Sequence, residues 1–198
     1  GTNGKTSVAW YLAQICKYNK IPSKLSGTLG FYKNNKKVKN TFLTTPSNLE
    51  LYQFANSNKI NNDIFISEAS SHGLHQGRYN NINIDIAAIT NLSHDHLDYH
   101  KTFGEYRDVK KLFFDHLSKS AFALTNVDDK NGQIMLQNTK AAKKSYSQKT
   151  LADYKVRILE KSFSGMLLKI NQHEVWVQLV GGFNASNLGA IYGVASLL

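Results

Sequence analysis

The sequence predicts an α/β fold: a mostly parallel, P-loop-type sheet flanked by helices, with a small antiparallel β appendage in its C-terminal part. Three observations support this fold. Residues 1–7 read Gly-Thr-Asn-Gly-Lys-Thr-Ser, a glycine-rich phosphate loop that leads directly into a helical pattern. Short apolar runs then alternate with helical segments, as in parallel sheets that carry helices on both faces. After about residue 154, short strands of alternating polarity replace this pattern.

The first half of the chain contains two predicted helices, a hairpin and a buried strand. Apolar residues recur at helical spacing over residues 5–18. Residues 28–42 match a hairpin that turns at Asn34-Asn35. A second helix is expected over residues 48–58, and the apolar run at 63–67 predicts a short buried strand.

The second half is expected to add two buried strands, two helices and the antiparallel appendage. Apolar runs at 84–90 and 121–126 predict the strands. Between them, Thr102 is a candidate N-cap for a helix that continues to about Leu117, because Glu105 follows three residues later as in a capping box. The strands of the appendage are expected at residues 156–159, 166–170 and 175–179. The final helix is expected from about residue 184 onward.

Composition limits the classes of protein that fit. With 198 residues, 41% of them apolar, the chain can form one domain with a sizeable core. No apolar run approaches the ~20 residues that span a bilayer, and the first residues lack a signal-peptide pattern. The single cysteine, Cys16, excludes an internal disulfide, which fits a reducing compartment.

The net charge of +10 raises the question of nucleic-acid binding. The lysines are scattered among polar residues, and no stripe of alternating basic and aromatic residues is present. Solvated surface lysine is therefore the simpler interpretation. A second interpretation is that the lysines within residues 33–39 help to attract an anionic substrate.

The phosphate loop predicts nucleotide binding. Glycine lets the backbone turn tightly and bring its N–H groups onto phosphate oxygens, and the positive end of the following helix adds to this. In a P-loop, Lys5 would reach the β- and γ-phosphates and the Thr6 hydroxyl would hold Mg²⁺. The alternative is a glycine turn that only begins a helix, which the Gly-Lys-Thr run makes the weaker interpretation.

Two further segments carry candidate metal ligands. Glu68 directly follows the strand at 63–67, at the strand end where ligands bind in open α/β sheets, so we expect it to hold Mg²⁺. A salt-bridged rim residue is the alternative. After the strand at 84–90, residues 94–100 contain three histidines and two aspartates. This cluster could bind zinc, but in a P-loop context nucleotide phosphate and Mg²⁺ are favoured.

These segments resemble the motifs of the Mur ligase family, and within it the branch of UDP-N-acetylmuramoyl-tripeptide synthases. The phosphate loop alone is also found in folylpolyglutamate synthases, whereas the Thr-Thr-Pro and Ser-Ser-His-Gly-Leu segments are much more specific. The matches span nearly the whole chain in family order, at residues 1–6, 44–46, 68–74, 91–100, 106–113 and 182–187.

The resemblance implies roles for the residues that match. ATP would be held by the phosphate loop and by two asparagines beside the adenine: Gly1, Thr2, Asn3, Gly4, Lys5, Thr6, Ser7, Asn184 and Asn187. The Mg²⁺ ligands would be Thr6, Glu68, His96 and Lys110, the last as its carbamate. The UDP-muramyl dipeptide would lie against Thr44, Thr45, Ser70, Gln76 and Arg78, where a guanidinium suits carboxylate or phosphate. The catalytic residues would be Lys5, Lys110 and His96. From the residues alone, Gln76 and Arg78 would be ordinary loop surface.

Lys110 matches the lysine that the family carbamylates. An ammonium group beside Mg²⁺ would be repelled, whereas a carbamate is an anionic oxygen ligand. From the residues alone, Lys110 and Lys111 are most simply solvated helix side chains. The match departs from the family pattern in that Val109 stands where alanine is usual, and His94, often arginine in relatives, is given no role.

The resemblance also implies an ATP- and Mg²⁺-dependent amide ligase of peptidoglycan biosynthesis, acting in the cytoplasm. It would add the third amino acid, meso-diaminopimelate in preference to L-lysine, to UDP-N-acetylmuramoyl-L-alanyl-D-glutamate through an acyl phosphate. Its partners would be these two substrates, with no nucleic acid and no membrane insertion, and we expect a monomer.

Residues 1–198 would form the central ATP-binding domain of such a ligase, truncated at both ends. The N-terminal UDP-binding and C-terminal amino-acid-binding domains would be absent from this chain. Two alternatives stay open: another Mur-like ligase, such as a folylpolyglutamate or cyanophycin synthase, and a non-enzymatic P-loop or basic nucleic-acid-binding module.

Overall fold

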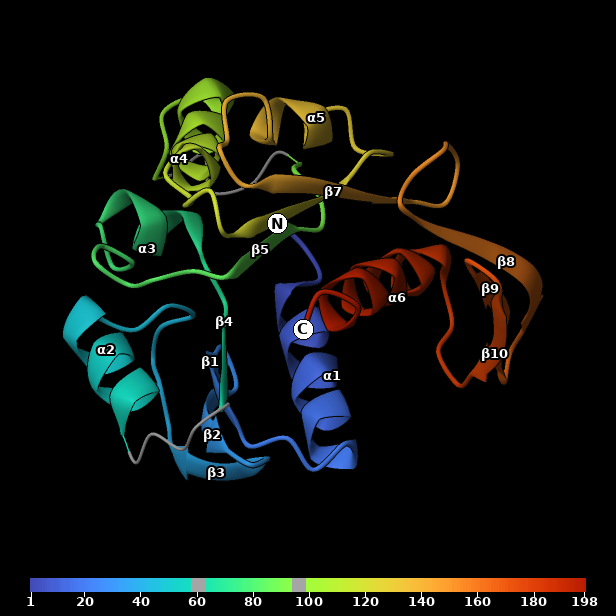
Figure 1. Cartoon of the computed structure of the whole chain (residues 1–198), viewed down its shortest axis with the longest axis horizontal. Coiled ribbons are helices and arrows are strands. Elements are labelled where there is room, and N and C mark those ends of the chain that lie inside the picture. The colour runs from blue at the N-terminus through green and yellow to red at the C-terminus, as the bar shows by residue number, and fades with distance from the viewer. Residues whose placement is uncertain (58–62, 94–98) are drawn as a thin grey trace. The chain divides into compact units, whose positions relative to one another are not determined.

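The computed structural model describes residues 1–57, 63–93 and 99–198. It divides into two compact units, each with its own sheet (Figure 1). Unit 1 takes residues 1–4, 84–95 and 111–198, and unit 2 takes residues 5–83 and 96–110. The predicted α/β architecture with parallel strands and flanking helices is confirmed, although the described strands pair in two sheets where one was expected.

Unit 2 is built around a four-stranded sheet. Its elements in chain order are α1 (Lys5–Tyr18), β1 (Ser23–Gly27), β2 (Gly30–Lys33), β3 (Lys36–Lys39), α2 (Asn48–Asn56), β4 (Ile64–Ser67) and α3 (Ser71–His75). The strand order is β3-β2-β1-β4, with β1 parallel to β4 and antiparallel to β2. Helices α1 and α2 lie on opposite sides of these strands (Figure 1).

One face of this sheet packs on α1. Leu25 of β1, Tyr32 of β2 and Ile66 of β4 lie side by side in register and pack with small residues of α1. Trp10 of α1 contacts the Tyr32 ring edge-on, with 5.2 Å between ring centroids. Burial of this apolar row fixes the register, because a shift by one residue would turn every side chain to the other face.

The opposite face of the sheet packs on α2. Phe54 of α2 lies edge-on to Phe31 of β2 and Phe65 of β4. Lys24 of β1 is only 2% exposed, and its Nζ lies 2.7 Å from Asp63 Oδ2. The same ammonium donates to a main-chain carbonyl in the last turn of α2, so the buried charge is paired and hydrogen-bonded.

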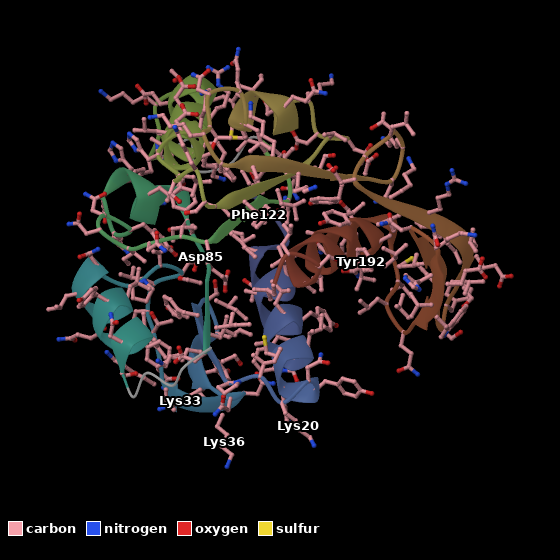
Figure 2. The ribbon with its side chains drawn as sticks, viewed as in Figure 1. Lys20, Lys33, Lys36, Asp85, Phe122 and Tyr192 are labelled. Atoms are coloured by element: carbon pink, nitrogen blue, oxygen red, sulfur yellow. The ribbon has the colours of Figure 1, made fainter. Side chains whose placement is uncertain are left out.

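The β2–β3 turn forms at Asn34 and Asn35, as predicted. Both residues have left-handed backbone angles, with φ of 48° and 63°, which two-residue hairpin turns require and asparagine tolerates. Lys33 and Lys36 flank the turn, and Lys20 lies near it at the same end of unit 2 (Figure 2). β3 is an edge strand with all four residues exposed, and lysines at such an edge discourage pairing with another chain.

Unit 1 is built around a six-stranded sheet. Its strand order is β10-β9-β8-β7-β6-β5, parallel from β5 to β8 and antiparallel from β8 to β10, which confirms the predicted appendage. Its elements are β5 (Ile86–Ile89), α4 (Phe103–Asp115, with its first residues in unit 2), β6 (Phe122–Asn126), α5 (Gly132–Met135), β7 (Ala142–Ser147), β8 (Tyr154–Ser162), β9 (Gly165–Ile170), β10 (His173–Val177) and α6 (Gly182–Ala195).

Helix α6 covers one side of the unit 1 sheet and α5 the other (Figure 1). Ala185 of α6 packs in a core with buried side chains of β8 and β9, which are Val156, Met166, Leu168 and Ile170. Because small residues recur along α6, the helix lies close to the sheet and buries most of its length.

The helix boundaries largely match the predictions. α1 covers residues 5–18, and α2 begins at Asn48 after a capping box formed by Ser47 and Glu50. Thr102 caps α4, since the Glu105 N–H donates to its hydroxyl at 3.1 Å. This helix ends at Asp115, two residues earlier than expected. Among the described residues, no helix is both long and apolar enough to cross a membrane.

Candidate functional site

The centre of the candidate site in unit 2 is a contact between the start of α1 and the end of β4. Thr6 lies in the first turn of α1, and Glu68 is the first residue beyond β4. The Thr6 hydroxyl donates a 2.7 Å hydrogen bond to Glu68 Oε2. Glu68 is 4% exposed, so its carboxylate is held in one place by partners and not by solvent.

Thr28, which follows β1, is the second partner of this carboxylate. Its N–H donates to Glu68 Oε1 at 2.8 Å, and its hydroxyl lies 3.3 Å from Oε2. The hydroxyl also lies 3.2 Å from Thr44 Oγ1. A carboxylate flanked by hydroxyl oxygens is the donor set that a hard cation such as Mg²⁺ prefers, so the residues fit the expected metal.

The main chain of Glu68 is fixed by two hydroxyl groups. Thr45 Oγ1 donates to the Glu68 carbonyl oxygen at 2.7 Å, and the Tyr79 hydroxyl donates to the same oxygen at 3.0 Å. The Tyr79 hydroxyl also lies 2.7 Å from Ser67 Oγ. Burial raises the pKa of Tyr79 far above its ordinary value, which keeps this hydroxyl protonated.

The residues expected to hold the dipeptide substrate form one hydrogen-bonded group with Thr45. Ser70 N–H donates to Thr45 Oγ1 at 2.9 Å, and the two hydroxyl oxygens lie 3.0 Å apart. The Arg78 guanidinium donates to the Thr45 carbonyl and to Gln76 Oε1. The structure therefore brings Thr44, Thr45, Ser70, Gln76 and Arg78 together, around the same strand end as Glu68.

A buried lysine lies in the remaining part of unit 2. Lys110 is 3% exposed, and its ammonium donates to the Tyr106 hydroxyl. The His100 ring centroid lies 5.5 Å from that of Tyr106. Lys111 instead forms an ion pair with Asp115 at 2.7 Å. Of the two adjacent lysines, Lys110 is the one that burial separates from bulk water.

Two histidine rings of α3 form a cluster with Tyr99, which precedes α4. The His72 and Tyr99 rings are tilted against each other with 3.9 Å between centroids, and His75 Nδ1 lies 3.0 Å from the Tyr99 hydroxyl. Gln76 Nε2 donates to the same hydroxyl at 3.3 Å. The predicted ligand His96 and the unassigned His94 lie outside the described residues. Among the residues that are described, no group of three or more His, Cys, Asp or Glu side chains could hold a metal ion; residues 94–98, which the zinc alternative needs, are not among them.

The first half of the phosphate loop belongs to unit 1, where it docks on the end of β5. Thr2 N–H donates to the Asn91 carbonyl at 2.8 Å, and Asn3 N–H donates to Asn91 Oδ1 at 2.9 Å. The Thr90 hydroxyl donates to the Asn3 carbonyl. Gly1 precedes these residues and is half-buried, and Lys5 and Ser7 follow in the first turn of α1.

Gly4 occupies a position in unit 1 that only glycine suits. Its φ is +82°, and a Cβ added there would lie 2.3 Å from Asn187 Oδ1. Asn187 is 8% exposed, whereas Asn184 is half-buried and donates to the Val180 carbonyl at 2.8 Å. The two asparagines expected beside the adenine therefore have different surroundings, and Asn187 lies against the phosphate loop.

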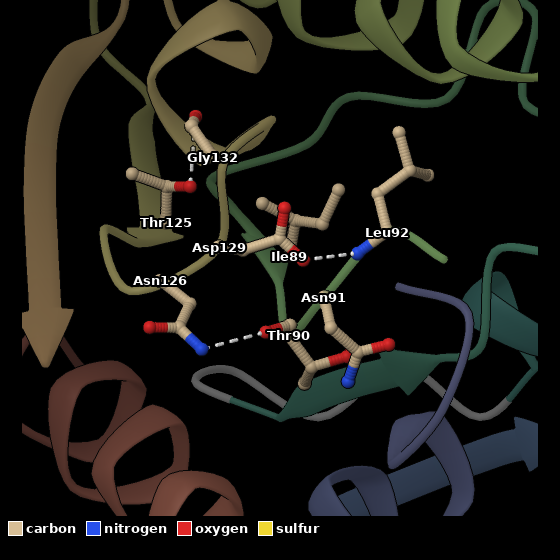
Figure 3. A pocket seen from close by; sticks show the side chains of 8 residues that line it. All are labelled: Ile89, Thr90, Asn91, Leu92, Thr125, Asn126, Asp129 and Gly132. Atoms are coloured by element: carbon tan, nitrogen blue, oxygen red, sulfur yellow. Dashed lines mark hydrogen bonds between the residues drawn. The ribbon is translucent and has the colours of Figure 1, made fainter. Parts of the chain in front are cut away.

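A shallow hollow lies at the carboxyl ends of β5 and β6 in unit 1 (Figure 3). Asp129 Oδ2 accepts the Leu92 N–H at 2.6 Å, and Asn126 Nδ2 donates to the Thr90 carbonyl at 3.1 Å. These side chains hold the β5 end on which the phosphate loop docks. Sequence reasoning missed both, although the position of Asn126 at the end of the strand predicted at 121–126, and of Asp129 in the loop that follows, was available as a signal.

Asp128, the neighbour of Asp129, organises the loop after β7. Burial alone would raise its pKa, but hydrogen bonds from the Ser147 hydroxyl and from the N–H groups of Gln148 and Lys149 outweigh burial. The pKa of Asp128 is therefore lower than its ordinary value. Gln148 Nε2 in turn donates to the Gly182 carbonyl at the start of α6, at 3.0 Å.

Residues 1–195 match the Mur ligase middle domain family. A UDP-N-acetylmuramoyl-L-alanyl-D-glutamate--2,6-diaminopimelate ligase of Parabacteroides distasonis is 46% identical over 98% of this chain and 40% of its own length. The ligase of the same name from Bacteroides fragilis is 43% identical over 100% of this chain and 41% of its own length.

A solved structure titled as the same type of diaminopimelate ligase superposes with a TM-score of 0.85. It is 32% identical and covers 99% of this chain and 42% of its own chain. The chain thus spans about two fifths of the length of the curated relatives that it matches. The family match extends over nearly every residue, so the chain belongs to the Mur ligase family as a middle domain.

Proposed function

We propose that this chain is the ATP-binding domain of a ligase that adds diaminopimelate to UDP-N-acetylmuramoyl-L-alanyl-D-glutamate in the cytoplasm. The names of the relatives that are 43% and 46% identical support this substrate pair over folate or cyanophycin precursors. Because the chain covers about two fifths of those relatives, the activity is proposed for the protein as encoded, with whatever residues flank 1–198.

The observation that carries the proposal is the contact between Thr6 and Glu68. A P-loop threonine and a strand-end carboxylate lie 2.7 Å apart, within the group that contains Thr45 and Ser70. A plain nucleotide-binding module needs a phosphate loop but no second polar group built onto its metal-binding carboxylate. The arrangement therefore favours a reaction in which a second substrate meets the nucleotide.

The proposed reaction has two steps. A carboxylate oxygen of the D-glutamyl residue attacks the γ-phosphorus of ATP, which forms an acyl phosphate and releases ADP. The amine of the incoming amino acid then attacks the acyl carbon, so that an amide forms, phosphate leaves and the amine loses a proton. Lys5 and the loop N–H groups would offset the negative charge that develops on the transferred phosphoryl group.

Thr6 and Glu68 would hold Mg²⁺, with Lys110 as a carbamate and His96 as the further ligands that the family resemblance implies. When bound, this ion neutralises charge on the phosphate oxygens and orients them. The Arg78 guanidinium would hold a carboxylate or phosphate of the UDP-dipeptide, with Thr44, Ser70 and Gln76 beside it.

The test is a ligation assay with the protein as encoded. Phosphate release is measured with UDP-N-acetylmuramoyl-L-alanyl-D-glutamate and either meso-diaminopimelate or L-lysine, and product is identified by mass spectrometry. We expect Mg²⁺-dependent amide formation with diaminopimelate. Turnover of a folate with glutamate, or salt-dependent DNA binding without ligation, would overturn the proposal. Residues 1–198 alone are expected to show little or no ligation.

A further inference from the structure

We propose that Asp129 is a positioning residue for nucleotide binding. It acts through the peptide unit between Asn91 and Leu92, on which the phosphate loop docks. The inference rests on the proposed function, because it takes residues 1–7 as the part of the chain that holds the phosphates of ATP. Neither the phosphate-loop motif nor the family resemblance gives Asp129 a role.

The first residues of the phosphate loop take their position from the segment after β5. The Asn91 side chain pairs with the main chain of Asn3, since its Oδ1 accepts the Asn3 N–H at 2.9 Å and its Nδ2 donates to the Asn3 carbonyl at 3.2 Å. The Asn91 carbonyl accepts the Thr2 N–H at 2.8 Å. The Ser93 N–H donates to Thr2 Oγ1 at 3.0 Å. A displacement of residues 91–93 would therefore displace the loop.

Asp129 holds this segment from the side of β6 (Figure 3). Its Oδ2 accepts the Leu92 N–H at 2.6 Å. That N–H and the Asn91 carbonyl belong to one planar peptide unit, so a bond at the N–H fixes the direction in which the carbonyl meets Thr2. Hydrogen bonds in a chain also polarise one another, so a carboxylate at the N–H makes the carbonyl a stronger acceptor.

Asp129 is itself fixed by a tight turn after β6. Its Oδ1 accepts the Asn131 N–H at 2.8 Å, and its carbonyl accepts the Gly132 N–H at 2.9 Å. A Cβ added at Gly132 would lie 2.1 Å from the Asn126 carbonyl oxygen, so the turn closes in this form only with glycine there. The two carboxylate oxygens thus tie the turn to the segment after β5.

Charge and position predict opposite effects of removing this carboxylate. A negative charge in the same unit as the first half of the phosphate loop repels the phosphates of ATP, so electrostatics alone predicts tighter nucleotide binding in Asp129→Asn. Loss of positioning predicts weaker binding, because the one amide oxygen of asparagine cannot replace both carboxylate oxygens. The sign of the change in affinity therefore separates the two effects.

The test measures nucleotide affinity directly. Binding of a non-hydrolysable ATP analogue with Mg²⁺ is followed by isothermal titration calorimetry, using the protein as encoded. We expect Asp129→Asn to bind the analogue about tenfold more weakly than wild type. Asp153→Asn is the matched control, because Asp153 also accepts a main-chain N–H in unit 1, that of Ser145 at 2.8 Å, and it should bind as wild type does.

Two further variants follow the route of the effect. Asp129→Glu keeps the charge but moves the carboxylate by one methylene, so it should also weaken binding, and it covers the case in which Asp129→Asn fails to fold. Asn91→Ala removes the side chain that pairs with Asn3. If Asp129 acts through this segment, Asp129→Asn should cost less affinity in the Asn91→Ala background than in wild type.

Unchanged or tighter binding in Asp129→Asn would overturn the inference, as would equal losses in Asp129→Asn and Asp153→Asn or strictly additive losses with Asn91→Ala. Urea denaturation of the same variants identifies any loss of affinity that only follows a loss of folded protein. Wild-type protein that binds the analogue but ligates nothing would overturn the proposed function, while the affinities of the variants still decide the role of Asp129.

Discussion

Thr6 and Glu68 form a 2.7 Å hydrogen bond although 62 residues separate them in the sequence. The contact exists because β1 and β4 are parallel neighbours and α1 packs on both, so the helix start and the strand end meet at one edge of the unit 2 sheet. This is the edge at which open α/β sheets bind ligands. The proposed metal site is therefore a consequence of strand order.

Removal of the Thr6 hydroxyl tests this contact. We expect Thr6→Val to lower kcat/KM for ATP by about 10- to 100-fold, because the metal loses an oxygen ligand and Glu68 loses a partner. Thr6→Ser retains the hydroxyl and should stay near wild type. Steady-state kinetics over a range of Mg²⁺ concentrations measure the effect, and equal activity of Thr6→Val and Thr6→Ser would contradict it.

Gly4→Ala tests the backbone of the phosphate loop. The substitution places a Cβ 2.3 Å from Asn187 Oδ1 at a left-handed φ, so we expect a loss of about 1–3 kcal/mol in the free energy of unfolding. Binding of an ATP analogue should weaken as well. Gly104→Ala is the control, since its added Cβ would meet nothing closer than 3.6 Å. Urea denaturation followed by circular dichroism gives the free energy of unfolding of both variants. Comparable losses in Gly4→Ala and Gly104→Ala would refute the claim.

Lys110 and Lys111 are adjacent but should respond differently to alanine. Lys110→Ala is expected to abolish ligation, because the proposed carbamate ligand is lost. Lys111→Ala breaks only the ion pair with Asp115 and should cost about 0.5 kcal/mol of stability with little change in rate. Initial ligation rates and thermal unfolding of the two variants separate these effects. An inactive Lys111→Ala with an active Lys110→Ala would reverse the assignment.

Asp128 should make part of the stability depend on pH. Its pKa in the folded protein lies below the ordinary value of 3.8, so its stabilisation is present above that value and is lost as the pH falls through the folded pKa. Wild type should therefore be more stable than Asp128→Asn at pH 7, and the difference should shrink below about pH 4. Urea denaturation of both proteins from pH 7 to pH 3 measures it; a difference that is constant with pH would count against the assignment.

The fold could be predicted wherever apolar runs mark an element, and two strands without such runs were missed. β1, Ser-Lys-Leu-Ser-Gly, is buried along its whole length, yet it contains one large apolar residue. Its burial depends on Asp63, which pairs with Lys24 and which no local pattern reveals. β7 begins with exposed residues and buries only Tyr146 and Ser147 at its end, so it resembles a polar loop.

The site was predicted from motifs. Motifs do not show which residues of other segments hold the site residues in place by hydrogen bonds. Glu68 was identified by its position after a strand, but the Thr28 N–H and the Tyr79 hydroxyl that fix it come from other segments. The sequence alone could not show whether Lys110 or Lys111 is buried. Adjacent residues lie on different faces of a helix, and the sequence does not reveal which face packs against the rest of the protein. The assigned roles stay predictions until the variants above are measured.

The division of the chain between the units has a consequence for biosynthesis. Asn3 finds its partner in Asn91, 88 residues later, whereas residues 5–83 belong to unit 2. On the ribosome, the first residues must therefore wait until Asn91 has emerged before they can dock, and contacts between distant residues form slowly. Unit 1 is assembled from three separate stretches, so no single deletion or protease cut would release it whole.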